Sequence, residues 1–293
     1  MLKDVNMHVE NVYMKEFIFV VDKQFNNIKP LDFLRAKGVS DEIIKKVKFG
    51  GIFINGKLLT NANERARFGD EVKMALPPDK TNPYVVPIKA PLDVIYEDQF
   101  LIAVNKPKGM LTHSSRHNKT VALEQVVCGY FLPHPFTFRA VNRLDRDTSG
   151  IVLIAKDEYT ASLLSKQIKE GKMQKTYSAL VVGEAPSERF IIEKPIKRIS
   201  PSVVKRTCAE DGQYAKTECA LVKRLNDGKS IIDVILHTGR THQIRVHLSS
   251  VGLPLFADSL YGEKVEGATY TLHAKQLKFI HPITKKEMVI TAK

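Results

Sequence analysis

The stretch Arg143-Leu-Asp-Arg-Asp-Thr-Ser-Gly-Ile-Val-Leu-Ile-Ala-Lys156 joins a polar loop that contains glycine directly to an apolar strand. This order places the carboxylates of Asp145 and Asp147 at the mouth of a sheet, with Arg143 and Arg146 beside them. Arginines so close keep a carboxylate ionised and can also hold phosphates. An Asp-rich turn by itself is more often a surface turn with local ion pairs, so a functional interpretation depends on the rest of the chain.

The second informative stretch is Gln174-Lys-Thr-Tyr-Ser-Ala-Leu-Val-Val-Gly183, which predicts a strand. Because side chains alternate along a strand, Tyr177 shares one face with Ala179. A single tyrosine in such a strand is more often a core or edge aromatic than a catalytic group. Its meaning therefore also depends on its neighbours in the fold.

The third stretch, His237–Pro254, contains Arg240, Arg245 and three histidines. The glycine and proline near its end favour a helix, whereas alternating apolar residues at 244–248 favour a strand. Neighbouring histidines are five residues apart. In a strand two such residues point to opposite faces, and on a helix they lie about 140° apart. No local ligand set forms from His237, His242 and His247, and no metal site is predicted.

Composition and charge limit the class of protein. Of the 293 residues, 43% are hydrophobic and 26% charged, which is typical of a soluble globular protein. The net charge of +13 predicts a polyanionic partner, by default nucleic acid. No apolar run approaches the ~20 residues of a membrane span, and the N-terminus has no signal-peptide pattern. The three cysteines form no C-x-x-C pair, and with these features they predict a cytoplasmic protein with no membrane partner.

Prolines divide the chain into two predicted domains. They are concentrated between residues 77 and 91, a density that breaks both helices and strands. We therefore expect a first domain at 13–80, a linker at 81–90 and a second domain at 91–293. Such a linker also predicts that few contacts cross the domain boundary.

Local patterns predict the main elements of both domains. In the first domain, helices are expected at 30–38 and at 41–48, the latter capped by Ser40, with strands at 51–56 and 70–75. Gly51-x-x-x-x-Gly56-Lys57 imitates a phosphate-binding loop, but Leu58 replaces the required Ser or Thr, so none is predicted. In the second domain, strands are expected at 93–96, 100–105, 216–225 and 230–237, with helices at 120–129 and 157–171. Asn226-Asp-Gly-Lys229 predicts a hairpin between two of these strands.

Residues 15 to about 76 resemble the small RNA-binding alpha-L domain that is shared with a small-subunit ribosomal protein. The resemblance rests on Leu31-Asp-Phe-Leu34, on Ile54-Asn-Gly-Lys57 and on Gly69-Asp-Glu-Val72. It implies that basic side chains of the two helices face RNA phosphates, whereas the alternative is an ordinary solvated helix face. The candidate RNA-binding residues are Arg35, Lys37, Lys45, Lys46 and Lys48.

The segment from about Val94 to the C-terminus resembles the RluA-type pseudouridine synthases. Four motifs occur in the family's order, namely Val104–His113, Arg143-Leu-Asp-x-x-Thr-Ser-Gly-Ile, Lys175–Gly183 and Thr238–Leu248. The two resemblances together imply an α+β chain. A mainly antiparallel, mixed sheet with flanking helices would form the catalytic domain, preceded by the small α+β RNA-binding domain.

Two positions depart from the family pattern. Asn142 stands where most members have His, and Ala257 precedes Asp258 where the pattern usually has Gly. Neither change removes a catalytic group. We expect Asn142 to alter how the target nucleotide or its neighbour is held.

The resemblance implies isomerisation of uridine to pseudouridine within ribosomal or transfer RNA, by a monomer without cofactor or metal. Asp145 matches the essential aspartate, Tyr177 the tyrosine that stacks on the base, and Arg245 the cation paired with the aspartate. Arg240 competes for that last role, and Arg143 is the candidate to fill the stack after base flipping. Arg143, Arg146 and Arg240 are also expected to bind RNA.

Two alternatives from other classes remain open in the sequence. One is a catalytically silent RNA-binding or assembly factor, which the joint presence of Asp145, Tyr177 and Arg245 disfavours. The other is a nucleoside hydrolase that releases uracil, but an enzyme for free nucleosides has no use for a charge of +13.

Overall fold

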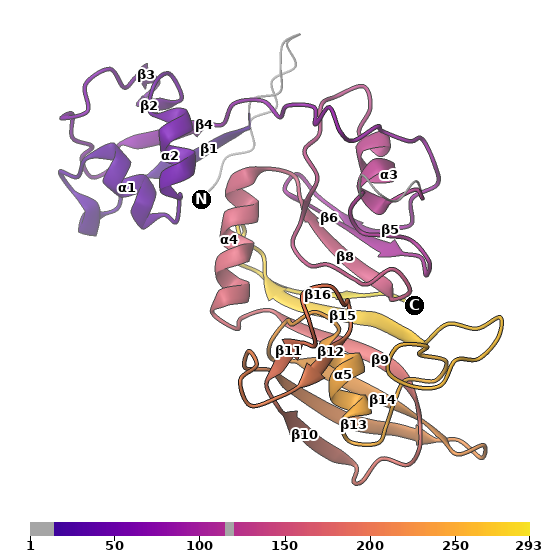
Figure 1. Ribbon diagram of the computed structural model, residues 1–293. Helices are drawn as coiled ribbons and strands as arrows, with labels where there is room; N and C mark the ends of the chain where they lie inside the picture. The colour runs from indigo at the N-terminus through magenta and orange to yellow at the C-terminus, as the bar shows by residue number, and fades with distance from the viewer. Residues whose placement is uncertain (1–14, 115–119) are drawn as a thin grey trace.

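The computed structural model describes residues 15–114 and 120–293, which form three sheets and their helices (Figure 1). Residues 13 and 14 of the predicted first domain lie outside this part of the chain. Residues 15–76, here called the N-terminal unit, carry a four-stranded sheet in the order β1-β4-β2-β3. A ten-stranded sheet and a two-stranded sheet follow.

In the N-terminal unit both predicted helices and the strand at 70–75 are present, whereas the strand predicted at 51–56 ends at Ile54 and the strand at 16–20 was not predicted. Ser40 caps α2, because its side chain accepts a hydrogen bond from the Ile43 amide. Asn55 and Gly56 both have positive φ and form the tight turn between β2 and β3. The apparent phosphate-binding loop is therefore a β-hairpin, as expected. The elements are β1 (Glu16–Val20), the 3-10 helix η1 (Lys23–Phe25), α1 (Pro30–Ala36), α2 (Asp41–Val47), β2 (Ile52–Ile54), β3 (Lys57–Leu58) and β4 (Glu71–Ala75).

The ten-stranded sheet runs in the order β10-β13-β14-β9-β15-β8-β6-β5, with β16 beside β15 and β7 beside β8. Strands β8 and β15 pair in parallel and every other pair is antiparallel, which confirms the predicted mixed, mainly antiparallel sheet. The strands are β5 (Val94–Glu97), β6 (Leu101–Lys106), β7 (Arg139–Ala140), β8 (Ser149–Ala155), β9 (Gln174–Val182), β10 (Arg189–Glu193), β13 (Lys216–Arg224), β14 (Lys229–Leu236), β15 (Leu272–Ile280) and β16 (Glu287–Thr291).

Three helices and one small hairpin flank this sheet. They are α3 (Leu123–Tyr130), α4 (Glu158–Lys169), α5 (Gln243–Ser249) and the hairpin of β11 (Ile196–Arg198) with β12 (Arg206–Cys208). Residues 243–248 of α5 are all buried, so this segment is a helix covered on every side. Burial on all sides explains why its apolar residues also alternated like those of a strand. None of the described helices has the length and apolarity needed to cross a membrane.

The proline-rich stretch packs against the part of the chain that follows it, both at Asp79, just before the predicted linker, and at Ile88 within the linker. The carboxylate of Asp79 binds the guanidinium of Arg139, and the Ile88 amide donates to the carbonyl of Gln125 on α3. Ile88 also lies so close to Gly129 that a Cβ there would approach the Ile88 oxygen to 2.1 Å. The prolines thus make an extended segment that packs against α3.

The expectation that few contacts cross the domain boundary is wrong. Tyr159 of α4 is 3% exposed and belongs to the hydrophobic core of the N-terminal unit. Its ring packs against Phe17 at 4.9 Å between centroids, and its hydroxyl donates to the Lys37 carbonyl at 2.7 Å. Glu158, next to it, pairs with Lys46 of α2. The side of α4 that faces the N-terminal unit in Figure 1 therefore completes the core of that unit.

Replacing Tyr159 with Ala is expected to lower the free energy of unfolding by about 3–5 kcal/mol, since a buried aromatic ring is lost. The matched change Tyr159→Phe keeps the ring and removes only one hydrogen bond, so a loss of about 1 kcal/mol is expected. Urea denaturation of both variants measures the difference. Equal stabilities of Tyr159→Ala and the parent chain would show that the two units are not joined through this ring.

Candidate active site

Asp145 lies in a turn that leads into β8. The Thr148 amide donates to the Asp145 carbonyl at 3.1 Å and closes the turn. Gly150 follows with a φ of 107°, and a Cβ there would lie 2.4 Å from the Ala274 oxygen on β15. Only glycine combines this backbone conformation with such a close approach. The Thr-Ser-Gly part of the motif therefore holds the aspartate turn against β15.

A buried lysine fixes the same turn from the other side. Lys106 is 0% exposed, and its ammonium donates to the carbonyls of Pro107, Met110 and Arg146 at 3.0, 2.7 and 3.0 Å. Burial lowers its pKa to about 8, an effect that Asp147 and Asp145 partly offset. The ammonium form has three N–H groups for these three acceptors. Sequence reasoning missed Lys106, although a lysine that ends an apolar strand was a visible signal.

Asn142, one of the two departures from the family pattern, binds the backbone next to the Asp145 turn. Its side chain is buried, its amide donates to the Ile151 carbonyl at 2.9 Å, and its oxygen accepts from the Leu153 amide at 2.9 Å. Both polar groups of Asn142 are therefore used to bind the backbone of β8. The residue has a structural role in placing the loop that carries Asp145.

Arg245 of α5 brings a cation to Asp145. Its Nη1 lies 3.6 Å from Asp145 Oδ2, whereas its Nε and Nη2 bind the two oxygens of Asp258 at 2.7 Å each. The guanidinium also lies over the ring of Tyr270, 4.4 Å from its centroid. Asp258 is fully buried and was not predicted as a site residue. One feature of the sequence pointed to this position, because Ala257 stands where the family pattern usually has Gly. Ala257 has a φ of 60°, a conformation that favours glycine.

Tyr177 lies on β9, between partner strands β14 and β15. The side chain is 5% exposed, and burial, with the nearby charge of Asp145, raises the pKa of its hydroxyl well above the usual value. The phenol is therefore neutral at physiological pH. The fold thus brings Tyr177 and Arg245 to Asp145 from two different parts of the chain.

Of the two arginines next to Asp145 in sequence, Arg146 pairs with Asp147 and not with Asp145. Arg146 binds Asp147 through two hydrogen bonds of 3.0 and 2.9 Å. Arg143 is exposed. The cation close to Asp145 is therefore Arg245, because the turn directs the side chain of Arg146 to its neighbour Asp147. Arg240, the competitor for this role, donates from Nε to the Tyr214 carbonyl at 3.0 Å.

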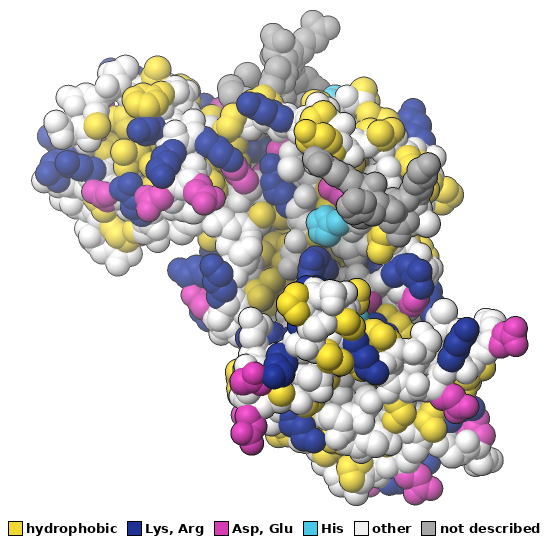
Figure 2. Space-filling model, viewed as in Figure 1, with side chains coloured by type: hydrophobic (Ala, Val, Ile, Leu, Met, Phe, Trp, Pro, Cys, Tyr) yellow, Lys and Arg dark blue, Asp and Glu magenta, His cyan; other side chains and the backbone are white. Residues whose placement is uncertain are grey.

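The predicted RNA-binding cations of the N-terminal unit fall into two groups. Arg35 is held by Asp32 and Asp41 at 2.8 Å each, Lys37 lies 3.2 Å from Asp22, and Lys46 pairs with Glu158. Lys45 and Lys48 are exposed, and no carboxylate within the described ranges pairs with them. Figure 2 shows this mixture, with carboxylates lying among the Lys and Arg side chains of the N-terminal unit.

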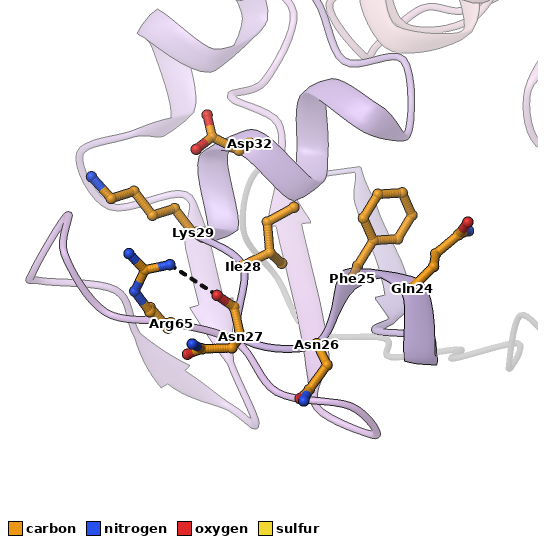
Figure 3. Close-up of a pocket in the computed structure, with 8 residues that line it drawn as sticks. All are labelled: Gln24, Phe25, Asn26, Asn27, Ile28, Lys29, Asp32 and Arg65. Carbon is orange, nitrogen blue, oxygen red and sulfur yellow. Dashed lines mark hydrogen bonds between the residues drawn. The ribbon is translucent and has the colours of Figure 1, made fainter.

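A shallow pocket of about 350 Å³ lies on the N-terminal unit and is separate from Asp145. Figure 3 shows its polar lining, in which Arg65 donates to the Asn27 carbonyl at 2.9 Å. Lys29 and Arg65 contribute two cations that sequence reasoning did not single out. The pocket lining contains none of the three predicted catalytic residues.

The histidines of the third stretch point to different partners. His237 binds Glu218, His242 binds the hydroxyl of Tyr261, and His247 binds Thr217 and the Lys194 carbonyl. Across residues 15–114 and 120–293, no group of three or more His, Cys, Asp or Glu side chains is arranged to hold a metal ion.

Comparison with known proteins gives the family. The family of RNA pseudouridylate synthases matches at residues 100–250. An uncharacterized RNA pseudouridine synthase of Bacillus subtilis (strain 168), YjbO, is 35% identical over 256 residues, which cover 86% of this chain and 90% of that protein. The ribosomal large subunit pseudouridine synthase C of Buchnera aphidicola is 33% identical over 270 residues, covering 85% and 84% of the two chains.

A solved structure supports the same conclusion. The human RNA pseudouridylate synthase domain containing 1 superposes with a TM-score of 0.59 at 25% identity, over 69% of this chain and 83% of that one. The match extends the agreement from sequence to fold. The chain therefore belongs to the RluA-type family of RNA pseudouridine synthases, which are isomerases.

Proposed function

We propose that this chain converts specific uridines of large-subunit ribosomal RNA to pseudouridine, with Asp145 as the essential group. The observation that carries the proposal is the half-exposed Asp145 carboxylate, which faces Arg245 at 3.6 Å beside the neutral phenol of Tyr177. The choice of RNA is supported by the 33% identical relative named as a ribosomal large subunit pseudouridine synthase.

The reaction rearranges one nucleotide without loss of any group. The bond between the anomeric carbon of the ribose and N1 of uracil breaks, the base turns, and C5 joins the anomeric carbon. The hydrogen on C5 is then removed and a proton is returned to N1. Atoms and electrons balance without an external oxidant, reductant or second substrate.

Asp145 is suited to this chemistry because one of its oxygens is held and the other is available. Arg245 Nη1 faces Oδ2, and no donor among the described residues binds Oδ1. An ionised carboxylate beside the ribose can attack a carbon or accept a proton. We propose that Oδ1 is the oxygen that acts on the nucleotide.

Tyr177 and Arg143 complete the proposed site. The ring of Tyr177 provides a flat apolar surface on which the uracil can stack and turn. The target base is normally stacked in RNA, so it has to be flipped out at a cost of a few kcal/mol. Arg143 is exposed next to the catalytic turn, and its planar guanidinium can fill the space that the base leaves.

RNA affinity is proposed to come from cations that carboxylates do not neutralise. Lys45 and Lys48 of the N-terminal unit are such cations, and Lys29 and Arg65 line the pocket nearby. Arg240 is a further such cation, since its Nε donates to a backbone carbonyl, whereas the candidate Arg146 is already paired with Asp147. A polyanionic backbone binds such free cations by releasing counterions.

The changes Lys45→Ala and Lys48→Ala are each expected to weaken RNA binding and to reduce the salt slope of log K by about 1 per lost phosphate contact. Arg35→Ala is the matched control, since two carboxylates already hold its guanidinium. Filter binding at several salt concentrations measures both quantities. A larger effect of Arg35→Ala than of the two lysine changes would assign the RNA-binding face to the paired cations instead.

The proposed substrate is tested with purified full-length protein and two transcribed RNAs, large-subunit ribosomal RNA and a transfer RNA. Pseudouridine is mapped by carbodiimide labelling and reverse transcription. We expect new pseudouridine in the ribosomal RNA. Modification of the transfer RNA alone would contradict the proposed ribosomal RNA substrate. If neither RNA were modified, the protein would be a silent RNA-binding factor. Release of free uracil would indicate a hydrolase.

The proposal includes a monomer that acts in the cytoplasm. Cys128, Cys208 and Cys219 are all free thiols, as expected in a reducing compartment. Size-exclusion chromatography with light scattering measures the oligomeric state directly.

A further inference from the structure

His242 lies next to Asp145 in an unusual backbone conformation. It is the residue that precedes α5, with a φ of 57°, and its side chain is only 10% exposed. Its Nε2 lies 3.9 Å from Asp145 Oδ2, the same oxygen that faces Arg245. Two nitrogen groups of the α5 region therefore converge on one oxygen of the carboxylate.

A short chain of hydrogen bonds favours one of the two neutral tautomers of His242. The Arg206 amide donates to the hydroxyl oxygen of Tyr261 at 2.8 Å, and that oxygen lies 2.8 Å from His242 Nδ1. With its oxygen accepting from Arg206, the Tyr261 hydroxyl can donate its own proton to Nδ1. A neutral imidazole whose Nδ1 accepts must carry its proton on Nε2. The Nε2–H group then faces Asp145.

The surroundings keep the imidazole neutral. Burial lowers the pKa of His242, and the cations of Arg245 and Arg206 lower it further, whereas Asp145 and Asp258 act in the opposite direction. The ring of Tyr261 meets the imidazole edge-on, with centroids 5.6 Å apart. A neutral donor can bind the carboxylate without adding a second full positive charge beside Arg245.

We propose that His242 is a positioning residue for Asp145, held by Tyr261 as the Nε2–H tautomer so that it donates to Oδ2 and turns Oδ1 toward the nucleotide. The inference rests on the proposed role of Asp145. Hydrogen bonds that are long in a free enzyme often shorten when the substrate binds. The 3.9 Å between His242 Nε2 and Asp145 Oδ2 in the free protein is therefore compatible with a hydrogen bond in the complex with RNA. The β11–β12 hairpin, through the Arg206 amide, then becomes part of the support of the active site.

The tautomer can be tested directly, without any measurement of activity. In full-length protein labelled with ¹⁵N-histidine, the signals of His242 are assigned by their loss in His242→Gln. We expect the nitrogen shifts of an Nε2–H imidazole in the parent chain and a shift toward a mixture of tautomers in Tyr261→Phe. An Nδ1–H imidazole in the parent chain would overturn the proposal, whatever the activity.

Kinetics test the positioning role. His242→Leu is expected to lower the single-turnover rate at saturating RNA by about 10–100-fold, since a misplaced carboxylate loses its alignment. His242→Gln keeps an N–H group at a similar distance. Its rate should lie above that of His242→Leu by at least a third of the logarithmic difference between His242→Leu and the parent chain. His237→Gln is the control for the same change at an exposed histidine, and we expect it to leave the rate unchanged.

The pH profile separates positioning from a merely structural role. The Tyr261 hydroxyl stabilises neutral His242 by donating to Nδ1, so its removal raises the pKa of the imidazole. Protonated His242 would put a second full positive charge beside Asp145 and make the carboxylate a weaker nucleophile and base, so in Tyr261→Phe the acidic fall of the rate should begin at higher pH than in the parent chain. An unchanged profile, or equal rates for His242→Leu and the parent, would overturn the role of His242. Full activity of Asp145→Asn would overturn the proposed function itself, which distinguishes the two failures.

Discussion

Replacing Asp145 with Asn is expected to reduce the single-turnover rate by at least about 10³-fold, because the amide can neither attack a carbon nor accept a proton. The change conserves shape, and the side chain is half-exposed, so folding should be retained. RNA affinity should also be retained, because the cations proposed to bind phosphates are untouched. Quenched-flow measurement of pseudouridine formation at saturating RNA gives the rate, and circular dichroism and filter binding give the two controls.

Asp147 offers a matched control within the same turn. Its carboxylate binds Arg146 in a surface ion pair, 3.0 and 2.9 Å from the guanidinium nitrogens. Such pairs contribute little to stability, typically up to about 1 kcal/mol. Asp147→Asn should therefore keep most of the activity. If Asp147→Asn were inactive and Asp145→Asn active, the assignment of the essential carboxylate would have to be exchanged.

Features set by neighbouring residues could be predicted from sequence. An acidic residue at 157 and a glycine at 171 predicted the position of α4, and Asp157 accepts from the Thr160 amide as a helix cap does. The turn residues at 226–229 predicted the β13–β14 hairpin, with Gly228 at a φ of 73°. In both cases the physical cause lies within a few residues of the element itself.

Features that depend on distant contacts could not be predicted in this way. In the sequence, Tyr159 lies in what looks like an ordinary amphipathic helix. Only the structure shows that its ring is part of the hydrophobic core of the N-terminal unit. Lys106 and Asp258 are buried charged residues, and each has a partner far away in the sequence, 40 positions for Lys106 and 13 for Asp258. Buried charges are rare unless paired, and the weak signals at Lys106 and at Ala257 do not reveal which partners would make burial possible.

The pairing of Arg245 with Asp145 was found through the family resemblance, and its geometry adds a condition that the resemblance did not contain. Two of the three guanidinium nitrogens of Arg245 donate to Asp258, and the third faces Asp145. Asp258 in turn accepts from the amides of Leu260 and Tyr261 at 3.0 and 3.2 Å. The orientation of the cation at the active site therefore depends on a carboxylate that does not itself face the site.

Replacing Asp258 with Asn is expected to lower the free energy of unfolding by about 3–5 kcal/mol, because it leaves the charge of Arg245 buried without its partner. The Arg245 side chain is 9% exposed and that of Asp258 is 0% exposed, so solvent screens neither group. The amide nitrogen of Asn would also face a donor, either the guanidinium or the backbone amide of Leu260. Urea denaturation measures this loss, which is a large part of the total stability of a typical domain.

The control for this change is Asp211→Asn, which breaks the exposed pair of Asp211 with Lys197 and should leave the stability nearly unchanged. In the folded fraction of Asp258→Asn, Arg245 is free to move away from Asp145, so the single-turnover rate should also fall by about 10–100-fold. The two effects have one cause, the loss of the fixed guanidinium. A variant that is destabilised but fully active would show that Asp258 supports the fold alone, and that Arg245 needs no partner to serve Asp145.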